Sequence, residues 1–450
     1  MREYLKVLIN TNLKKWLNDK IFRRILKNMG WLVGAKAITT IFVLAAISLK
    51  TYSLGSELFG LFSVIIAYVM TIKTLTSLQP WRALIKFGAE ALENSNPKEF
   101  IELIKFGLVL DIIAAIFGTF VAVSGAHFLG SFFNWSLETI QLAIIMSLSI
   151  LFSISEGTPT GILRLLNRFK AFTIQQVFQA IVGVIGAIVV YIMNWGIIGF
   201  IISALISIII GNITLFILAY QSLKQEGLLK YFSGPIIYFR DFLRFSIWAY
   251  LQSISRIPTE KIDVIIASTV ISLEAAGIYS VIKRITILLN QISDPMIMAV
   301  FPEFSILVAK RQLKEAYQYS LKIGILLISL FFPVVMIGSL FSPWILKYIF
   351  GAEFATGALA LSVFLIIKLI PLACSTIHPL FLSLGYAKQS AFLSMTFNML
   401  YLGMAYYLGS IFGLLGLVVA IGLQLHLSVI AKFTILYYKN HFVLAPKLPD

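Results

Sequence analysis

Long apolar runs, separated by short polar stretches, recur along the chain from about residue 29 to residue 437. A helix needs about 20 mostly apolar residues to cross a bilayer, and twelve stretches of the sequence meet this requirement. Their approximate cores are 29–49, 57–78, 104–128, 138–162, 172–193, 197–220, 242–270, 275–304, 318–341, 355–383, 389–409 and 413–437. The pattern predicts an all-α membrane protein with about twelve transmembrane helices.

Composition supports the same fold class. Of the 450 residues, 59% are hydrophobic and only 12% are charged, whereas a soluble domain carries about 25% charged residues. The connections between the predicted spans are too short to hold a soluble catalytic domain. The sequence therefore describes a protein whose main solvent is lipid.

The distribution of charge predicts an orientation. If the N-terminus is cytoplasmic, 27 of the 36 Lys and Arg residues fall in or beside cytoplasmic segments, and the outer connections hold only Lys50 and Lys347. Because Lys and Arg favour the cytoplasmic side, we expect a multi-pass protein of the cell (inner) membrane with both termini cytoplasmic. The net charge of +16 is then a topology signal, and we expect no nucleic-acid partner.

The predicted spans divide the chain into segments. Residues 1–28 interleave apolar residues with Lys and Arg and lack a small-residue cleavage site, which favours an amphipathic cytoplasmic segment on the inner leaflet over a signal peptide. The other segments are an N-terminal six-helix lobe (29–220), a cytoplasmic inter-lobe linker (221–241), a C-terminal six-helix lobe (242–437) and a cytoplasmic tail (438–450).

One short phrase occurs twice in the chain. SELFGLFSVI at 56–65 returns as LEAAGIYSVI at 273–282, and Gln79-Pro80 is echoed by Asp294-Pro295 at nearly the same offset. Six spans separate the two copies, and because six is even, both copies enter the membrane from the same side. The sequence therefore predicts two parallel six-helix repeats around an axis along the membrane normal.

The repeated phrase has the pattern Glu-x-x-Gly-x-x-Ser at a predicted helix start. Glutamate in a first turn suits the positive end of the helix dipole. Glycine and serine three residues apart lie on one helical face, where small side chains let two helices approach closely. We interpret the phrase as a helix-packing element rather than a substrate contact.

Charged residues inside the predicted spans are the candidate functional residues, since an ionisable group at membrane depth normally faces a cavity or a partner. The cations are Lys36, Lys73, Arg256, Lys261, Lys283, Arg284 and Lys368. The acids are Asp111, Glu156, Glu260, Asp263 and Asp294. The excess of cations predicts a basic interior, which suits a diphosphate because Arg and Lys donate strong hydrogen bonds to phosphate oxygens.

Lys283 and Arg284 lie two to three turns into their span, too deep for easy snorkelling, and are the leading candidates for diphosphate contacts. Lys36, Arg256 and Lys261 are further candidates. We expect them to face the same cleft.

For several of these charges the sequence leaves a structural alternative open. Internal ion pairing is an alternative for Lys283 and Arg284, and snorkelling is one for Lys36. Arg256 and Glu260 are i,i+4 partners that can form an ion pair instead.

The acidic residues and one proline have separate expected roles. Asp111, Glu260 and Asp263 are candidates for ion coupling or for ion pairs inside the cavity, and the sequence does not choose between these. Pro258 removes a backbone donor within the seventh span and can act as a gating hinge. Glu156, followed by Gly157 and Pro159, is expected at a solvated helix end.

Several stretches together resemble a known family. These are LGSELFGLFSVIIA, LTSLQPWRALIKFGAE, KIDVIIASTVISLEAAGIYSVIKR, MAVFPEFSILVAK and ILKYIFGAEFATGA. They are similar to the polysaccharide repeat-unit (O-antigen type) flippases of the polysaccharide synthesis family, in the multidrug/oligosaccharidyl-lipid/polysaccharide exporter superfamily. The similarity extends from about residue 25 to residue 440.

The resemblance implies a MATE-like fold, with two lobes around a central cavity. It also implies a cargo: a polyprenyl-diphosphate-linked oligosaccharide repeat unit, moved from the inner to the outer leaflet. Alternating access of the two lobes is the expected mechanism. Membrane lipids, a polysaccharide polymerase and glycosyltransferases are the further partners that the resemblance suggests for a protein of lipopolysaccharide O-antigen export.

Two other functions compete with this expectation. A multidrug or cation antiporter of the same superfamily has the same lobes, but its cavity favours acidic residues. A membrane-embedded glycan polymerase or ligase would carry a large outer loop with catalytic residues, and no such loop is predicted here. The histidines and the single cysteine, Cys374, lack metal-ligand spacing, so we expect no metal, no cofactor and no enzymatic activity.

Overall fold

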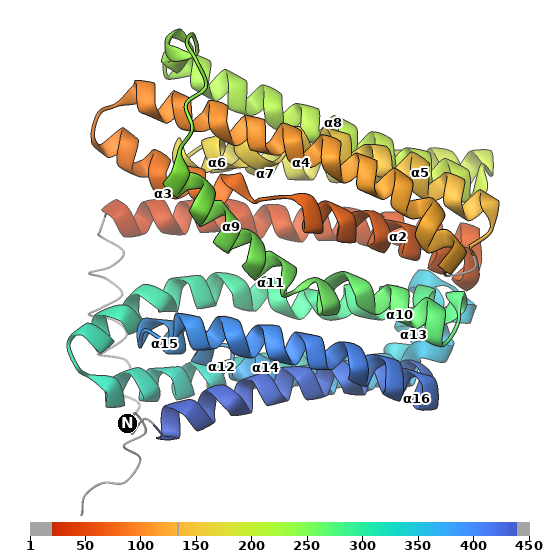
Figure 1. Ribbon diagram of the computed structural model, residues 1–450. Helices are drawn as coiled ribbons and strands as arrows, with labels where there is room; N and C mark the ends of the chain where they lie inside the picture. Colours follow the sequence, from red (N-terminus) through yellow and green to blue (C-terminus); the bar gives the residue numbers. More distant parts are fainter. Residues whose placement is uncertain (1–19, 133–134, 439–450) are drawn as a thin grey trace, which may run out of the picture.

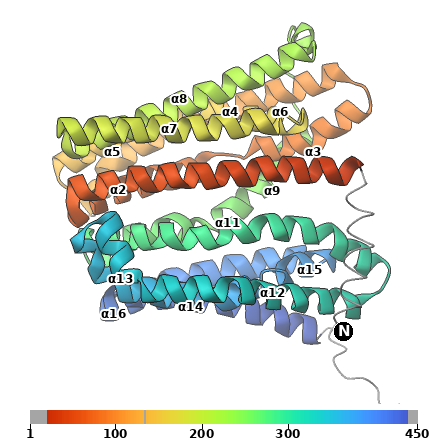
Figure 2. The same ribbon diagram turned by 180° about the vertical axis from the view of Figure 1, so that it is seen from behind.

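A computed structural model describes residues 20–132 and 135–438. The described chain forms two helical bundles that lie one beside the other in both views (Figures 1 and 2). The N-terminal lobe contains α2 (Lys20–Thr76), α3 (Pro80–Glu93), α4 (Pro97–Phe132), α5 (Leu137–Leu151), η1 (Phe152–Ser155), α6 (Gly157–Leu165), α7 (Phe169–Met193) and α8 (Gly196–Gln225). This confirms the all-helical membrane fold for the first half of the chain.

A connection with the short helix η2 (Leu228–Tyr231) leads to α9 (Arg240–Ile254), which crosses obliquely from the first lobe to the second (Figure 1). The second lobe continues with η3 (Pro258–Ile262), α10 (Asp263–Val270), α11 (Leu273–Ala309), α12 (Leu313–Leu340), α13 (Ser342–Ile345), η4 (Leu346–Phe350), η5 (Ala352–Gly357), α14 (Ala358–Ala373), α15 (Ile377–Ser383) and α16 (Ala387–Tyr438).

The bundle has two ends, which we name by a residue at each. The Gly55 end carries the sharp turn inside α2, and the Asn94 end carries the α3–α4 turn at 94–96. The start of α2 and the end of α16 both lie at the Asn94 end (Figure 1). The two ends of the described chain lie on the same side because the chain crosses the bundle an even number of times.

Eight helical stretches of the described residues are long and apolar enough to cross a membrane. Two of them each contain two predicted spans, because α2 turns at Gly55 (φ 69°) and α16 turns at Gly413 (φ 57°). Both glycines adopt a left-handed conformation that other L-residues rarely adopt. The predicted spans at 242–270 and 275–304 correspond to the region from α9 to α11.

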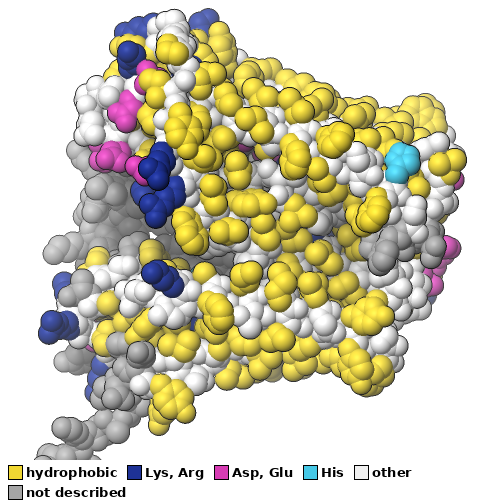
Figure 3. All heavy atoms as spheres, viewed as in Figure 1, with side chains coloured by type: hydrophobic (Ala, Val, Ile, Leu, Met, Phe, Trp, Pro, Cys, Tyr) yellow, Lys and Arg dark blue, Asp and Glu magenta, His cyan; other side chains and the backbone are white. Residues whose placement is uncertain are grey.

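The surface matches a lipid environment. In the view of Figure 3, hydrophobic side chains cover most of the face, while Lys and Arg gather at the Asn94 end. Large apolar residues such as Phe120 (67% exposed) and Leu340 (68% exposed) point outward. Exposed apolar surface on this scale would be unfavourable in water and is the normal exterior of a membrane protein.

The buried cores show how the lobes are joined. One large core includes residues of both lobes, among them Val64 and Ile65 of α2 and Val281 and Ile282 of α11, all fully buried. There are three smaller cores: one surrounds Phe100 and Leu163 and includes Phe242 of α9, the helix that joins the lobes, and two lie among α11, α12, α15 and α16. The lobes are thus packed together toward the Gly55 end and have separate cores toward the Asn94 end.

The two copies of the repeated phrase pack against each other at this junction. A Cβ on Gly60 would lie 1.8 Å from the Leu273 carbonyl oxygen, and one on Gly277 would lie 2.2 Å from the Ser56 carbonyl oxygen. Each glycine therefore lets the other copy's backbone approach, which confirms the helix-packing interpretation.

The helices break at three places: at the predicted end of the second span, within the fourth span, where the sequence suggested a continuous helix, and within the seventh span at Pro258, where a hinge was expected. The second span breaks at 77–79, where Gln79 is left-handed (φ 54°) before Pro80. The fourth passes through η1 at 152–155, and the seventh through the π-helix η3, which begins at Pro258. Proline removes a backbone donor and restricts the residue before it, which explains the breaks at Pro80 and Pro258. Of the predicted segments at the chain ends, residues 1–19 and 439–450 lie outside the described residues.

Candidate functional site

The main cavity lies within the N-terminal lobe and has a volume of about 550 Å³. It is bounded by α2, α3, α4, α6, α7 and α8, and η3 of the second lobe contributes Lys261. The charged groups that line it are Lys73, Asp111, Glu156, Arg164 and Lys261. The other polar groups are Thr74, Ser77, Gln79, Ser153, Thr160, Gln175, Gln176, Gln179 and Asn212.

The three interrupted spans all meet this cavity. Ser77 and Gln79 come from the first break, Ser153 and Glu156 from the second, and Lys261 from the third. Non-helical backbone at membrane depth is tolerated where it lines a polar space, and discontinuous helices commonly form transporter sites. The breaks therefore place polar backbone and side chains where a continuous helix would present an apolar face.

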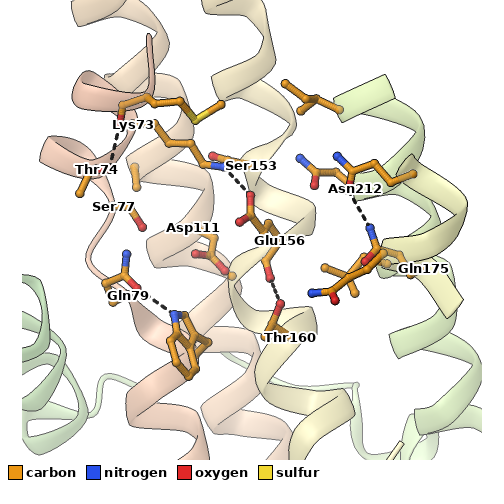
Figure 4. A pocket seen from close by; sticks show the side chains of 18 of the residues that line it. Lys73, Thr74, Ser77, Gln79, Asp111, Ser153, Glu156, Thr160, Gln175 and Asn212 are labelled. Atoms are coloured by element: carbon orange, nitrogen blue, oxygen red, sulfur yellow. Dashed lines mark hydrogen bonds and ion pairs between the residues drawn. The ribbon is translucent and has the colours of Figure 1, made fainter. Parts of the chain in front are cut away.

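Lys73 and Glu156 form an ion pair on one wall of the cavity (Figure 4). Lys73 comes from the last turns of α2, and Glu156 follows η1. The sequence placed Glu156 at a solvated helix end. Glu156 does precede α6 and its side chain is about half exposed, but it also forms an ion pair with Lys73 and lines the cavity, which the sequence did not predict.

Asp111 of α4 is buried, and its Oδ2 accepts hydrogen bonds from the backbone N–H and the hydroxyl of Thr158, both at 2.7 Å. These bonds cap the first turn of α6, whose N–H groups lack partners within the helix. A Cβ on Gly157 would lie 2.3 Å from Asp111 Oδ1, so glycine is needed for the carboxylate to reach this position. Among the described residues Asp111 forms no ion pair within 4.0 Å.

The wall opposite the ion pair consists of amides from α7 and α8 (Figure 4). Gln175 Nε2 donates to the Gly211 carbonyl at 2.9 Å and to Gln179 Oε1 at 3.2 Å. Asn212 Nδ2 donates to the Phe152 carbonyl at 3.2 Å. These contacts fix the orientation of the amides and leave the Gln175 and Asn212 side-chain oxygens without a partner among the described residues.

An aromatic corner completes the cavity. The Trp81 indole Nε1 donates to Gln79 Oε1 at 2.8 Å. The Arg164 guanidinium lies over the Trp81 ring at 4.6 Å and over the Phe172 ring at 5.4 Å. A cation stacked on two rings is held in place without an acidic partner.

The second lobe holds a separate buried ion pair. Lys283 Nζ lies 2.5 Å from Asp263 Oδ2 and donates to the Thr259 carbonyl at 3.0 Å. Asp263 is completely buried and also accepts from the Tyr279 hydroxyl at 3.1 Å. The structure thus brings together two predicted site residues, but the ammonium of Lys283 is engaged within the protein.

Arg284, the neighbouring candidate, is exposed on α11. Its positive charge acts on Lys50 of α2, so the two lobes each contribute one cation to this place. Lys50 also lies over the Phe62 ring at 4.6 Å. Neither cation forms an ion pair within 4.0 Å with an acid in the described part of the chain. The sequence assigned Lys50 to an outer connection and missed this pairing.

The structure places the remaining candidates individually. Arg256 Nε and Glu260 Oε1 are 4.0 Å apart, the i,i+4 pair that their spacing allows, and both side chains are about half exposed. Lys261 lines the cavity, Lys36 is exposed on α2, and Pro258 is the buried first residue of the π-helix η3.

Sequence reasoning missed the amide wall and Arg164. Three glutamines within five residues, Gln175, Gln176 and Gln179, interrupt an otherwise apolar predicted span. Their helical spacing places at least two on one face. Amides in a membrane helix require polar partners, so this cluster could have predicted a polar cavity beside the helix.

Comparison with known proteins gives the family. A model of the family described as "Polysaccharide biosynthesis protein" matches residues 25–308. The chain is 24% identical over 410 residues to "Putative O-antigen transporter" of Shigella flexneri, covering 87% of this chain and 93% of that protein. It is also 29% identical over 189 residues to "Inner membrane protein YghQ" of Escherichia coli K12, covering 41% of this chain and 52% of the relative.

Solved structures support the fold. An inward-facing multidrug resistance MATE family transporter of the MOP superfamily superposes with a TM-score of 0.72 at 17% identity, covering 89% of this chain and 94% of the other. A MOP superfamily transporter from Pyrococcus furiosus gives a TM-score of 0.65 at 18% identity, covering 94% and 97%. The fold is therefore MATE-like, as the resemblance implied, and the chain belongs to the polysaccharide biosynthesis protein family.

Proposed function

We propose that this protein translocates polyprenyl-diphosphate-linked oligosaccharide repeat units from the inner to the outer leaflet by alternating access. The observation that carries the proposal is that Lys50 and Arg284, one cation from each lobe, lie close enough for their charges to interact, while neither forms an ion pair with an acid in the described part of the chain. Two like charges at membrane depth are unfavourable unless an anion lies between them. A diphosphate headgroup is such an anion.

Physical cost explains why a protein is needed. Transferring an unpaired ionised group from water into hydrocarbon costs tens of kcal/mol of solvation free energy, whereas a polyprenyl tail is soluble in lipid. A route for the headgroup must therefore provide cations and hydrogen-bond donors. Arg284 can donate two parallel bonds to phosphate oxygens, and Lys50 adds a mobile point charge.

The other predicted site residues take supporting roles in this proposal. Lys261, Arg256 and Lys36 supply positive charge along the route to the Lys50–Arg284 pair. Lys283 acts indirectly, because its ammonium holds Asp263.

Ion coupling is a role for the acidic residues. Asp111, Glu260 and Asp263 are the candidates, and Asp111 and Asp263 are engaged in the contacts described above. Pro258 is the proposed hinge, since the helix changes from α to π geometry at that residue.

The arrangement of the cores supports alternating access. Because the lobes share one core toward the Gly55 end and have separate cores toward the Asn94 end, separation of the lobes at the Asn94 end costs less buried apolar area. In this proposal both termini are cytoplasmic, and the lobes separate at the Asn94 end to admit the cargo from the cytoplasm. Rocking of the lobes would then expose the cargo on the outer side.

Reconstituted vesicles test this function. The purified protein is placed in liposomes with a fluorescent polyprenyl-diphosphate oligosaccharide, and outward movement is followed with a membrane-impermeant quencher. Replacing both Lys50 and Arg284 by Gln is expected to lower the rate by about tenfold or more, because a hydrogen bond to a charged group contributes about 1.5–3 kcal/mol. Lys322→Gln, an exposed lysine on α12, is the control and is expected to retain the rate.

Full activity of the double variant would reject the Lys50–Arg284 pair as the anion site. Failure of the unaltered protein to move the lipid-linked oligosaccharide would reject the proposed function itself. If the unaltered protein instead exports cationic dyes from the same vesicles, the antiporter alternative would be supported.

A further inference from the structure

The cavity of the N-terminal lobe has a chemistry distinct from that of the Lys50–Arg284 pair. Its charges are largely engaged within the protein: Lys73 with Glu156, Asp111 with Thr158, and Arg164 with the rings of Trp81 and Phe172. Apart from Lys261, what remains available is neutral hydrogen-bonding capacity. We call the group formed by Gln175, Gln176, Gln179 and Asn212 the amide wall.

The amide wall has unused donors and acceptors. Gln176 makes no hydrogen bond with any described residue, although it lies half-buried on α7. Gln175 and Asn212 use their NH₂ groups on backbone carbonyls, so their oxygens remain free to accept. An unsatisfied amide in a membrane bundle is costly unless water or a ligand completes its hydrogen bonds. The wall therefore requires a polar occupant.

The rest of the cavity limits what that occupant is. Ser77, Ser153 and Thr160 add hydroxyl groups, which can both donate and accept. The lining also includes the apolar side chains of Met70, Ala114, Ile208 and Leu215. A ligand that combines many hydroxyls with apolar C–H faces satisfies both features, and this is the chemistry of a neutral sugar.

Size and position fit the same ligand. A volume of about 550 Å³ lies within the range of about 300–1,000 Å³ typical of small-ligand sites. Lys261, on η3 of the second lobe, stands at the boundary of the cavity. A phosphate attached to a ligand in the cavity would therefore meet a cation supplied by the second lobe.

We infer that the cavity of the N-terminal lobe is a carbohydrate-binding compartment that holds the neutral sugars of the cargo. Its amide wall hydrogen-bonds the sugar hydroxyls, and the apolar side chains of the lining pack against the C–H faces of the sugar. This inference rests on the proposed function for the identity of the cargo, but its sugar-binding claim can be tested separately. It divides recognition between the two lobes, with the sugars in one lobe and the diphosphate between them.

Binding measurements on the purified full-length protein in nanodiscs test the inference. Three probes are compared: a polyprenyl diphosphate carrying a neutral trisaccharide, the same polyprenyl diphosphate without sugar, and the free trisaccharide. The variant Gln176→Met keeps the side-chain length and removes the amide. Gln221→Leu, an exposed residue on α8 outside the cavity, is the matched control.

Gln176→Met is expected to weaken binding of the two sugar-containing probes by about fivefold to tenfold, the loss of one to two hydrogen bonds. It is expected to leave binding of the sugar-free lipid unchanged. Ser77→Ala, which removes one hydroxyl of the cavity lining, is expected to act in the same way. Arg284→Gln is expected to weaken both lipid probes and to spare the free trisaccharide, while Gln221→Leu changes none of the three.

Each other outcome overturns a defined claim. Equal weakening of all three probes by Gln176→Met would show a structural role for the amide and reject the compartment. Unchanged binding of the sugar probes in both cavity variants would reject it as well. If neither lipid probe binds but the free trisaccharide does, and Gln176→Met weakens it, the sugar compartment stands and the lipid-linked cargo is rejected.

Discussion

At the residue scale, some charged side chains inside the membrane form ion pairs within the protein, while others remain available to bind a ligand. Lys283 was a leading candidate for the diphosphate, yet its ammonium lies 2.5 Å from a completely buried carboxylate. Arg284, its neighbour in sequence, points from the same helix to a different place and acts on Lys50. Adjacent residues on a helix face directions about 100° apart, so two neighbouring cations cannot both be assigned to one ligand from sequence alone.

Removing the Lys283 ammonium tests this division. We expect Lys283→Met to lower the free energy of unfolding by about 3–5 kcal/mol, because it leaves the Asp263 carboxylate buried without its counter-charge. Thermal unfolding of the purified protein in detergent measures the effect. The double variant with Lys283→Met and Asp263→Asn is expected to recover most of the loss, and Lys86→Met, at an exposed lysine of α3, is expected to change little.

The opposite pattern would contradict the assignment. If Lys283→Met unfolds like the unaltered protein but no longer binds sugar-free polyprenyl diphosphate, the ammonium contacts the ligand rather than maintaining the fold.

At the scale of the helices, the repeated phrase explains how the lobes meet. Gly60 on α2 and Gly277 on α11 each face the backbone of the other copy. Because the two copies occupy equivalent positions in their lobes, one duplicated packing element forms both sides of the contact. Glu57 and Glu274, which begin the two phrases, are exposed, so the shared glycines and not the glutamates make the junction.

Alanine at one of these glycines is the appropriate perturbation. A Cβ on Gly60 would lie 1.8 Å from a backbone carbonyl oxygen that cannot move without shifting α11, so Gly60→Ala is expected to destabilise the protein by about 1–3 kcal/mol. At Gly403, on α16, a Cβ would meet nothing within 4 Å. Gly403→Ala is therefore expected to be neutral or to stabilise by up to about 1 kcal/mol, since alanine is the better helix former.

Thermal unfolding of the two variants in detergent, measured in parallel, tests whether Gly60→Ala lowers the unfolding temperature while Gly403→Ala leaves it unchanged or raises it. Equal unfolding temperatures for Gly60→Ala and Gly403→Ala would show that α2 and α11 do not require the close approach.

The helix pattern shows how far the sequence can be read. The apolar runs predicted the membrane spans because each must be about 20 residues long to cross lipid, and the repeated phrase predicted a close helix approach but not that its two copies, on α2 and α11, approach each other. The break at 152–156 was not predicted, because it depends on Asp111 capping α6 from another helix. The pairing of Lys50 with Arg284 and the amide wall likewise depend on contacts between distant segments. The local pattern of apolar and polar residues predicts which segments form helices, but it says little about contacts between segments that are distant in the sequence.

At the scale of the whole molecule, hydrogen bonds close the Gly55 end between the lobes. Glu353 of η5 accepts from both the backbone N–H and the hydroxyl of Ser56, each at 2.7 Å. The Tyr52 hydroxyl donates to the Tyr348 carbonyl at 2.7 Å. Glu353 thus receives the first free N–H after the turn at Gly55, where a helix begins and a carboxylate is electrostatically favoured.

Loss of this carboxylate is expected to shift the protein toward a state open at the Gly55 end. Glu353→Ala removes two hydrogen bonds that only the closed state makes, and a ligand or contact shifts an equilibrium by its differential stabilisation of the two states.

The shift is measured by labelling a cysteine introduced as Ala276→Cys, at a fully buried position on α11, in a background where Cys374 is replaced by Ser. A membrane-impermeant thiol reagent is expected to label this cysteine about tenfold faster in Glu353→Ala, since two charge-assisted hydrogen bonds contribute more than 1.4 kcal/mol. Glu57→Ala removes an exposed carboxylate at the same end and is expected to leave the labelling rate unchanged. Equal labelling in both variants would show that Glu353 does not hold the lobes together, and the closure would then rest on the shared apolar core, the two glycines and the remaining hydrogen bonds, such as that from Tyr52 to Tyr348.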